Sequence, residues 1–213
     1  MNKISEIVSF LEENYYPYPK EHFTKKREPF RTLISCLLSQ RTRDENTARA
    51  AAALFREAAT PQSLLRLSQG RMESLIRPAG PYRQKARRIM EICRKLLDDF
   101  EGKVPRVREE LMSLPGIGPK CADIVLMYGH GIPSIAVDTH VNRIPKRLGI
   151  VPEDASLEDV KYILEKRIPR DKWVVVNHGF VQFGRAICLP RYPKCQKCEL
   201  NGICKYYKNV KNK

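Results

Sequence analysis

The apolar residues of this chain recur at intervals of three and four positions, which is the spacing of amphipathic α-helices. The first two apolar stripes are Ile4, Ile7, Val8 and Leu11, and then Phe30, Leu33, Ile34, Leu37 and Leu38. The same pattern predicts further helices over residues 71–77, 84–100, 107–113, 119–129, 139–148, 157–167 and 172–187. No alternating stretch is long enough to predict a useful strand, so the predicted fold class is all-α.

Short polar residues mark where several helices are expected to begin. Asp44 is predicted to cap the helix that follows the second stripe, and Thr60 to cap a short helix through Leu67. Ser156 and Asp159 have the spacing of a capping box, with Asp in the place of the usual Glu.

A glycine-containing turn runs from Leu114 to Lys120 and leads into one of the predicted helices. Gly116 and Gly118 carry no Cβ, so the backbone can turn tightly and expose its N–H groups to a ligand. Pro119 suits the first position of a helix, where its missing N–H is tolerated. A tight turn that feeds a helix N-terminus is a natural site for an anion such as a DNA phosphate.

Lys120 falls in the first turn of that helix, where the helix dipole disfavours a cation. The same placement favours an amine that acts as a nucleophile, because a nucleophilic amine must first lose its proton. A plain phosphate contact is the alternative interpretation. Asp138 is predicted to cap the helix that starts at Thr139, and it also fits the carboxylate partner of a nucleophilic lysine.

The charge balance points to a polyanionic partner. The chain has 213 residues, with 39 Lys and Arg against 24 Asp and Glu, and its formal net charge is +15. One dense basic block alternates with apolar residues, which predicts the solvated face of an amphipathic helix. Its basic members are Arg83, Lys85, Arg87, Arg88, Arg94 and Lys95.

The composition predicts an intracellular, cytoplasmic protein with no membrane partner. No apolar run approaches the ~20 residues of a membrane span. Glutamates interrupt the N-terminal region where a signal peptide would be apolar. In such a compartment the seven cysteines argue against a disulfide framework. Cys36, Cys93 and Cys121 are predicted to pack as small residues and to carry no chemistry.

The remaining cysteines are Cys188, Cys195, Cys198 and Cys204, with the spacing C-x6-C-x2-C-x5-C. Four thiolates so close in sequence can bind one metal centre. Structural zinc sites typically use two close pairs and only one is present here, yet the spacing also differs from that of ferredoxins. The residues alone therefore leave zinc and iron–sulfur both open.

The stretch from Leu114 to Gly149 resembles the helix–hairpin–helix and Gly/Pro-Asp segment of DNA glycosylases of the endonuclease III family, and the resemblance extends from about Glu21 to Lys205. It implies that Lys120 attacks C1′ of a damaged nucleotide, and that Asp138 assists base departure and stabilises positive charge on the sugar. Relatives without lyase activity carry another residue at the position of Lys120. The resemblance thus implies a bifunctional glycosylase and abasic-site lyase, which removes oxidised pyrimidines from double-stranded DNA and cuts on the 3′ side by β-elimination through a Schiff base.

The resemblance also implies a division into domains and a cofactor. Residues 22–132 would form a six-helix bundle domain with the hairpin at 114–120, and residues 1–21 with 133–213 a discontinuous iron–sulfur cluster domain. The spacing of the four C-terminal cysteines matches the [4Fe–4S] loop of the family, which implies a structural cluster. The cluster would hold a basic loop against DNA phosphates, and family precedent implies a monomer. The basic residues of this loop are Arg185, Arg191, Lys194 and Lys197.

A base paired inside a duplex must be flipped out to meet Lys120, and the gap must be filled. The resemblance places this wedge at residues 39–42 and 80–82. The family often has glutamine where this chain has Arg41 and leucine where it has Pro81, and Gln40 takes over if the loop shifts by one position. Arg41 is equally compatible with a phosphate contact, and His140 with a plain surface position. The candidate DNA contacts are therefore Gly116, Gly118, Gln40, Arg41 and His140.

Two alternative functions remain open at this point. One is a mismatch-type glycosylase that acts on uracil or thymine, which Arg41 fits but Lys120 argues against in its monofunctional form. The other is a non-catalytic helix–hairpin–helix module that only grips DNA. The presence of both Lys120 and Asp138 argues against it.

Overall fold

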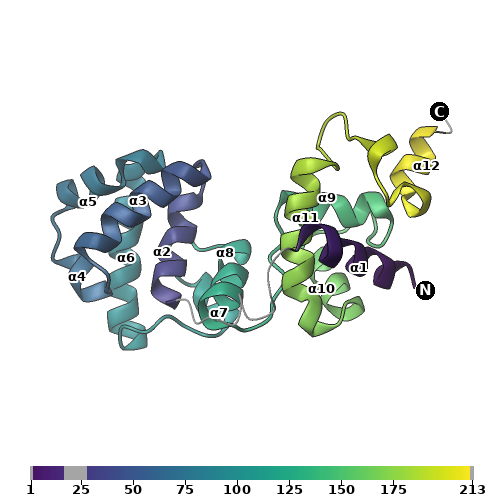
Figure 1. Cartoon of the computed structure of the whole chain (residues 1–213). Helices are drawn as coiled ribbons and strands as arrows, with labels where there is room; N and C mark the ends of the chain where they lie inside the picture. The colour runs from purple at the N-terminus through teal and green to yellow at the C-terminus, as the bar shows by residue number, and fades with distance from the viewer. Residues whose placement is uncertain (1, 17–27, 212–213) are drawn as a thin grey trace. The chain divides into compact units, whose positions relative to one another are not determined.

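The computed structural model describes residues 2–16 and 28–211 (Figure 1). All regular secondary structure in these residues is helical, which confirms the all-α prediction. The chain divides into two compact units, residues 25–132 and residues 1–24 with 133–213. The expected boundary at residues 21 and 22 lies outside the described residues. No helix in the described part of the chain is both long and apolar enough to cross a bilayer.

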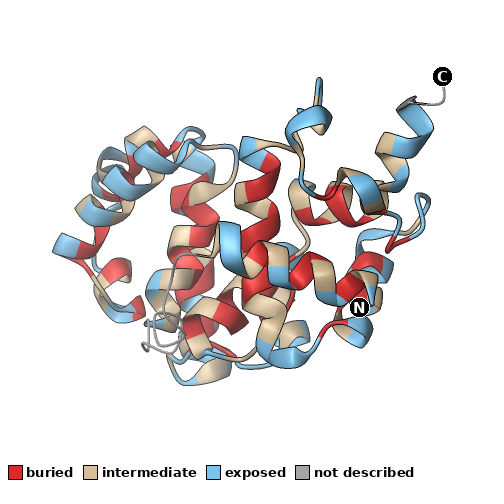
Figure 2. Cartoon of the chain, turned by 45° about the vertical axis from the view of Figure 1, so that its right-hand side comes forward, coloured by how far each residue is buried: buried red, intermediate tan, exposed pale blue. Residues whose placement is uncertain are grey.

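The unit of residues 25–132 is built from consecutive helices around one apolar core. Its helices are α2 (Pro29–Ser39), α3 (Asp44–Glu57), α4 (Pro61–Leu65), α5 (Gln69–Ile76), η2 (Arg77–Ala79), α6 (Tyr82–Phe100), α7 (Arg108–Met112), α8 (Pro119–Ile124) and η3 (Val125–His130). The predicted apolar stripe of α2 is buried, and Leu33, Ile34, Leu37 and Leu38 have no exposed surface. Figure 2 shows buried residues in red along one face of several helices.

The second unit joins the N-terminal helix to the C-terminal half of the chain. Its helices are α1 (Lys3–Tyr15), α9 (Thr139–Leu148), α10 (Leu157–Arg167), η4 (Arg170–Lys172), α11 (Trp173–Ala186), η5 (Cys195–Lys197), η6 (Asn201–Ile203) and α12 (Lys205–Lys211). The stripe of α1 packs on α11, where Phe183 meets Phe10 and Tyr15 edge-on at ring distances of 5.5 Å. The helix pattern of the sequence therefore located most α-helices of both units to within a few residues, but it did not predict α12.

The predicted helix caps are confirmed with one exception. Thr60 accepts a hydrogen bond from the Ser63 N–H, and Ser156 forms the predicted capping box with Asp159. Asp44 does not cap its helix: the N-cap residue of α3 is Arg43, and Asp44 is the first helical residue. An aspartate in the first turn still stabilises the helix through its dipole. The helix predicted over residues 119–129 changes at Val125 from α-helix to π-helix, whose wider turn the apolar pattern does not reveal.

Candidate functional site

The hairpin between α7 and α8 keeps its apolar residues inside and its glycines outside. Leu114 and Ile117 are buried, and the Ile117 N–H donates to the Leu114 carbonyl over 3.1 Å. Gly116, Gly118 and Lys120 are exposed. Buried side chains thus anchor a turn that presents backbone groups and one amine to solvent.

Gly116 is required by both its conformation and its surroundings. Its φ of +77° lies in the left-handed region, which glycine adopts without steric cost. A Cβ at this position would lie only 2.9 Å from Cδ of Arg88. The Gly116 carbonyl accepts a hydrogen bond of 2.9 Å from Nε2 of Gln40. The fold therefore brings together two of the candidate DNA contacts, Gln40 and Gly116.

Lys85 departs from the prediction of a solvated basic face. The side chain is 2% exposed, so the prediction is wrong for this member of the block, whereas Arg83, Arg87 and Arg94 are exposed as expected. Lys85 lies in the first turn of α6, next to Ala86, which is also buried. Here the ends of α2 and η2 leave carbonyl groups without helical partners, and a lysine supplies the missing donors.

The Lys85 ammonium joins two loops. Its three N–H groups are shared among four acceptors that lie 2.6 to 2.8 Å from Nζ: the carbonyls of Leu38, Gln40 and Ala79 and the hydroxyl of Thr42. Thr42 in turn donates to the Ala79 carbonyl over 2.6 Å. Burial lowers the pKa of Lys85 to about 8, which leaves the ammonium charged at pH 7. The loop after α2 and the turn before α6, where the resemblance places the wedge, are therefore held together.

The helices on either side of the hairpin are joined by a buried ion pair. Asp123 of α8 is 1% exposed, and its Oδ1 lies 3.1 Å from Nε of Arg108 of α7. The sequence pattern does not predict this pair. Its only signal is a carboxylate within the apolar stretch that follows Lys120.

Asp138 caps α9 as predicted. Its Oδ1 atom accepts hydrogen bonds from the N–H groups of His140 and Val141, both at 2.8 Å. The cap does not use Oδ2. One carboxylate oxygen thus fixes the side chain at the start of the helix.

The backbone of the segment before Asp138 forms hydrogen bonds with side chains of two helices. Asn177 of α11 accepts from the Ala136 N–H over 2.7 Å and donates to the Ala136 carbonyl over 2.9 Å. Glu165 of α10 accepts from the Ile135 N–H over 3.1 Å. Sequence reasoning missed both residues, and for Asn177 the available signal is a polar residue within an apolar helix.

His140 is half-buried, contrary to the surface position that is usual for a histidine in a first helical turn. Its ring lies against Gly184 of α11, where a Cβ would come within 2.2 Å of Nδ1. Nη2 of Arg143 lies 3.2 Å from the same nitrogen. The ring is therefore held by its neighbours.

Lys120 belongs to the 25–132 unit and Asp138 to the other unit.

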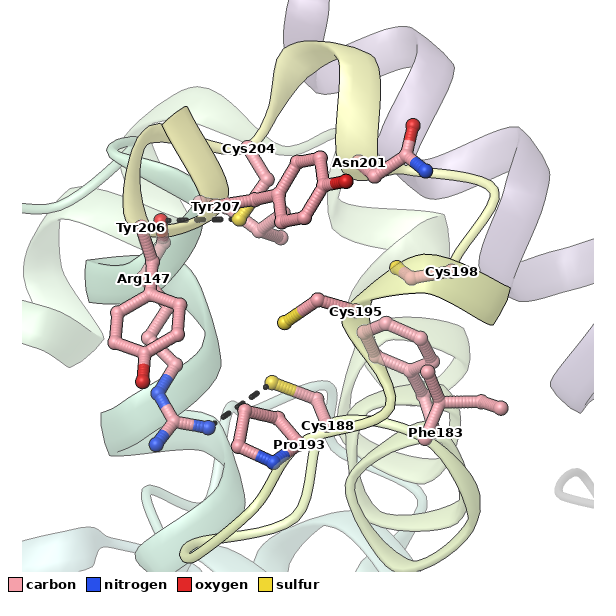
Figure 3. Close-up of a pocket in the computed structure, with 12 residues that line it drawn as sticks. Arg147, Phe183, Cys188, Pro193, Cys195, Cys198, Asn201, Cys204, Tyr206 and Tyr207 are labelled. Atoms are coloured by element: carbon pink, nitrogen blue, oxygen red, sulfur yellow. Dashed lines mark hydrogen bonds between the residues drawn. The ribbon is translucent and has the colours of Figure 1, made fainter. Parts of the chain in front are cut away.

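The four C-terminal cysteines line one pocket (Figure 3). Figure 3 shows their sulfur atoms around a shared space that Phe183, Tyr206 and Tyr207 border. The segment that carries these cysteines contains only short 3₁₀ helices. The cysteines therefore meet through the folding of the chain, since no long helix of the segment aligns them. They are Cys188, Cys195, Cys198 and Cys204.

Two arginines of α9 hold this segment in place. Arg147 donates to the Leu189 carbonyl over 2.7 Å and to the Pro190 carbonyl over 2.8 Å, and its Nη1 lies 3.4 Å from the Cys188 sulfur. Arg143 donates to the Cys188 carbonyl over 2.8 Å. The sequence pattern predicts no role for these two arginines. The four basic residues of the predicted DNA-binding loop are all exposed: Arg185, Arg191, Lys194 and Lys197.

The cysteine pocket disfavours several thiolates at once. Burial, and with it the charges of the other three cysteines, raises the pKa of Cys198 to about 11. Burial and then the charges of Cys188 and Cys204 raise the pKa of Cys195. A positively charged centre among the four sulfur atoms would offset this repulsion. Among the described residues, however, no three His, Cys, Asp or Glu side chains are already arranged to hold a metal ion.

Comparison with known proteins gives consistent matches. The family model described as "HhH-GPD superfamily base excision DNA repair protein" matches residues 34–170. The chain is 47% identical to the endonuclease III of Thermotoga maritima over 191 residues, which are 90% of this chain and 88% of that protein. The fold is similar to that of an endonuclease III in a non-covalent DNA complex, with a TM-score of 0.87, 35% identity and full coverage of both chains. It is equally similar to an endonuclease III in a trapped covalent DNA intermediate, with a TM-score of 0.86, 35% identity and 99% coverage of both chains.

Proposed function

Because this chain belongs to the endonuclease III family of base excision DNA repair proteins, we propose that Lys120 and Asp138 carry out its reaction. The enzyme is a DNA glycosylase with abasic-site lyase activity, and its partner is DNA. The observation that carries the assignment is the exposed amine of Lys120 at the end of a hairpin, in a fold similar to one trapped in a covalent DNA intermediate. Similarity to endonuclease III over 90% of the chain weighs against the mismatch-type glycosylase and the non-catalytic module. A chromosomal substrate would place the enzyme in the cytoplasm, at the nucleoid.

In the first step the Lys120 amine attacks C1′ of the damaged nucleotide. The N–C1′ bond forms, the glycosidic bond breaks, and the base leaves with the bonding electrons. Positive charge develops on the sugar as the base departs, and the Asp138 carboxylate stabilises it. The cap fixes this carboxylate through Oδ1, which gives the charge a defined position.

In the second step the sugar ring opens and leaves a Schiff base between Lys120 and C1′. Loss of a proton from C2′ then expels the 3′ phosphate, which is β-elimination and cuts the strand. Water hydrolyses the Schiff base and returns the free amine. The expected substrates are oxidised pyrimidines and abasic sites, as the resemblance implies.

The surfaces around Lys120 would hold and distort the DNA. We propose that Gly116 and Gly118 offer backbone N–H groups to a phosphate, while Gln40 and Arg41 fill the gap left by the flipped base. The Lys85 contacts support this role, because they fix the loop of Gln40 and Arg41 to the turn before α6. We propose His140 as a further contact to the DNA backbone.

We propose that the cysteine pocket holds a [4Fe–4S] cluster, with Cys188, Cys195, Cys198 and Cys204 as ligands. The donor set fits: four thiolates are the usual ligands of such a cluster, and all four line one pocket. A lone zinc ion would need all four sulfurs at ~2.3 Å from one point. When bound, the cluster would supply a rigid core for the basic loop and would take no part in the steps above. In this proposal residues 22–132 are the helix-bundle domain and residues 1–21 with 133–213 the cluster domain, close to the division into the units of residues 25–132 and of residues 1–24 with 133–213.

Borohydride trapping tests the catalytic assignment. Incubation with a duplex that carries an abasic site, followed by reduction, should link the protein covalently to DNA, and Lys120→Ala should abolish the link. The control is Lys103→Ala, at a lysine whose side chain is 79% exposed and paired with Glu101. Trapping that persists in Lys120→Ala would contradict the assignment.

Asp138→Asn separates charge from structure, because asparagine also serves as an N-cap. The variant should bind a duplex with thymine glycol as tightly as the wild type and release the base far more slowly. An unchanged rate of release would remove Asp138 from the mechanism.

Metal analysis tests the cofactor. The purified protein should contain iron and acid-labile sulfide, and Cys198→Ser should lose both, whereas Cys93→Ser in the core of the other unit should retain them. Zinc without sulfide would overturn the cluster proposal.

A further inference from the structure

Two buried cysteines of the 25–132 unit face each other. Cys36 lies in α2 and Cys121 in the first turn of α8, and each is 7% exposed. The Cys36 Sγ atom donates to the Cys121 Sγ atom over 2.6 Å. A disulfide bond measures ~2.05 Å, so the sulfur atoms need to approach by only about 0.5 Å to be joined. The sequence predicts packing without chemistry for both residues, and the fold alone reveals that they meet.

The two thiols are chemically different. The hydrogen bond from Cys36, a second one of 3.6 Å from Gln40, and the charge of Lys120 lower the pKa of Cys121. Donation to Cys121, and then burial, raise the pKa of Cys36. One sulfur is thus the readier nucleophile and the other holds its proton, which is how reactive thiols differ from inert ones. In contrast, burial raises the pKa of Cys93 to about 12.

A surface pocket reaches Cys36; Cys121 does not line it, and its sulfur lies 2.6 Å from the Cys36 sulfur. Its lining includes Cys36 together with Thr32, Ser35, Ser39 and Thr47. Four of these side chains carry hydroxyls, and the rest of the lining is Glu28, Arg31, Ile124 and Tyr128, so the pocket is largely polar and admits water and other small polar molecules. Hydrogen peroxide is such a molecule, and it oxidises thiolates.

We propose that Cys36 and Cys121 form a redox-active pair that closes to a disulfide when the protein meets hydrogen peroxide. First, the Cys121 thiolate attacks one peroxide oxygen: the S–O bond forms, the O–O bond breaks, and the departing hydroxide takes up a proton and leaves as water. The Cys36 sulfur then attacks the Cys121 sulfur. The S–S bond forms, the S–O bond breaks, and the hydroxyl leaves with the Cys36 proton as a second water. The two thiols lose two electrons to the peroxide, and a dithiol reductant reverses the reaction by exchange.

The bond would connect α2 to the start of α8 beside the hairpin. The Gln40 amide donates both to the Cys121 sulfur and to the Gly116 carbonyl, so oxidation changes one of its two partners. The proposal goes beyond the repair function and does not depend on it, because the bond can be measured without DNA.

Peptide mapping of the intact protein tests the proposal. Trypsin cuts at Arg31 and Arg41 and at Lys120 and Arg143, so the two cysteines fall in separate peptides, residues 32–41 and 121–143. Treatment with hydrogen peroxide, alkylation of the remaining thiols and digestion without reductant should yield these peptides as one linked species. Its mass should be lower than their sum by two hydrogen atoms. Dithiothreitol before alkylation should restore the separate, alkylated peptides.

Three variants complete the test. Cys36→Ser and Cys121→Ser should each lose the linked species, and in Cys36→Ser the Cys121 sulfur should accumulate as a sulfenic acid that dimedone captures. Cys93→Ser should form the link as readily as the wild type. The proposal is wrong if peroxide leaves peptides 32–41 and 121–143 unlinked in the wild type, or if they link only in urea.

Discussion

Replacement of Lys85 by methionine removes the ammonium that joins the end of α2 to the turn before α6. Methionine has nearly the same length and shape as lysine, so Lys85→Met takes away the donors and leaves little cavity. In the wild type Nζ has four acceptors at 2.6 to 2.8 Å, and the residue is 2% exposed. The variant therefore isolates the contribution of this one charged group.

The structure sets the size of the expected loss. The Thr42 hydroxyl keeps its bond of 2.6 Å to the Ala79 carbonyl, so these two groups stay paired. The Leu38 carbonyl loses its charged donor, and the Gln40 carbonyl keeps only the 3.2 Å contact from the Thr42 hydroxyl, which it shares with Ala79. Each unsatisfied buried group costs about 1–3 kcal/mol. The variant is also relieved of the desolvation cost of the ammonium, which leaves a net loss of about 2–4 kcal/mol. Against a total stability of about 5–15 kcal/mol this is a large fraction.

The assay must observe the right unit. Trp173 is the only tryptophan and lies in the other unit, so its fluorescence does not report on α2 and α6. Native-state hydrogen exchange does, because amides of α2 and α6 exchange through opening of their own unit. The matched control is Lys95→Met on the same helix, where the side chain is 34% exposed and pairs with Asp99. The control should lose less than about 0.5 kcal/mol.

One result would refute this reasoning. If the amides of α2 and α6 in Lys85→Met kept their protection to within about 0.5 kcal/mol of the wild type, the hydrogen bonds would only balance the cost of burying the charge. Lys85 would then contribute nothing net to the position of the Gln40 loop.

Three further predictions follow from the geometry. The difference in unfolding free energy between wild type and Lys85→Met should widen as pH rises from about 8 to 10.5, because the unfolded wild-type chain still binds a proton that the folded chain has released. Urea unfolding followed by circular dichroism measures this difference across the pH window. A constant difference would contradict the lowered pKa of Lys85. Gly70→Ala should stabilise α5 by about 0.5 kcal/mol, because nothing lies within 4 Å of the new Cβ. Gly179→Ala should destabilise the fold by about 1–3 kcal/mol, because its Cβ would lie 2.9 Å from the Cβ of Leu11. Thermal melting compares the two, and equal shifts would show that the α1–α11 contact yields freely. Asp138→Ala should lose about 1 kcal/mol and Asp138→Asn less, because asparagine still accepts from the N–H groups of His140 and Val141; similar losses in both would show that the cap depends on the charge.

Local patterns in the chain were sufficient for most of the helices, the hairpin and most of the caps. Each depends on residues only a few positions apart: the apolar stripe of α2, the turn from Leu114 to Lys120, and the cap of Asp138 on the two N–H groups that follow it. The family resemblance also rested on such a local stretch, and the comparisons confirmed it. Where local rules competed, as at Asp44, the position was wrong by a single residue.

The contacts between segments far apart in the sequence could not be predicted from local patterns. The sequence predicts Lys85 to be one more exposed basic residue on an amphipathic helix. It is buried because helix packing places its side chain over the carbonyl ends of α2 and η2. Cys36 and Cys121 are 85 positions apart, and Asn177 bonds to the backbone of Ala136, which is 41 positions away. A side chain's partners across such separations depend on how helices pack, and the periodicity of one helix contains no record of the helix that it will meet.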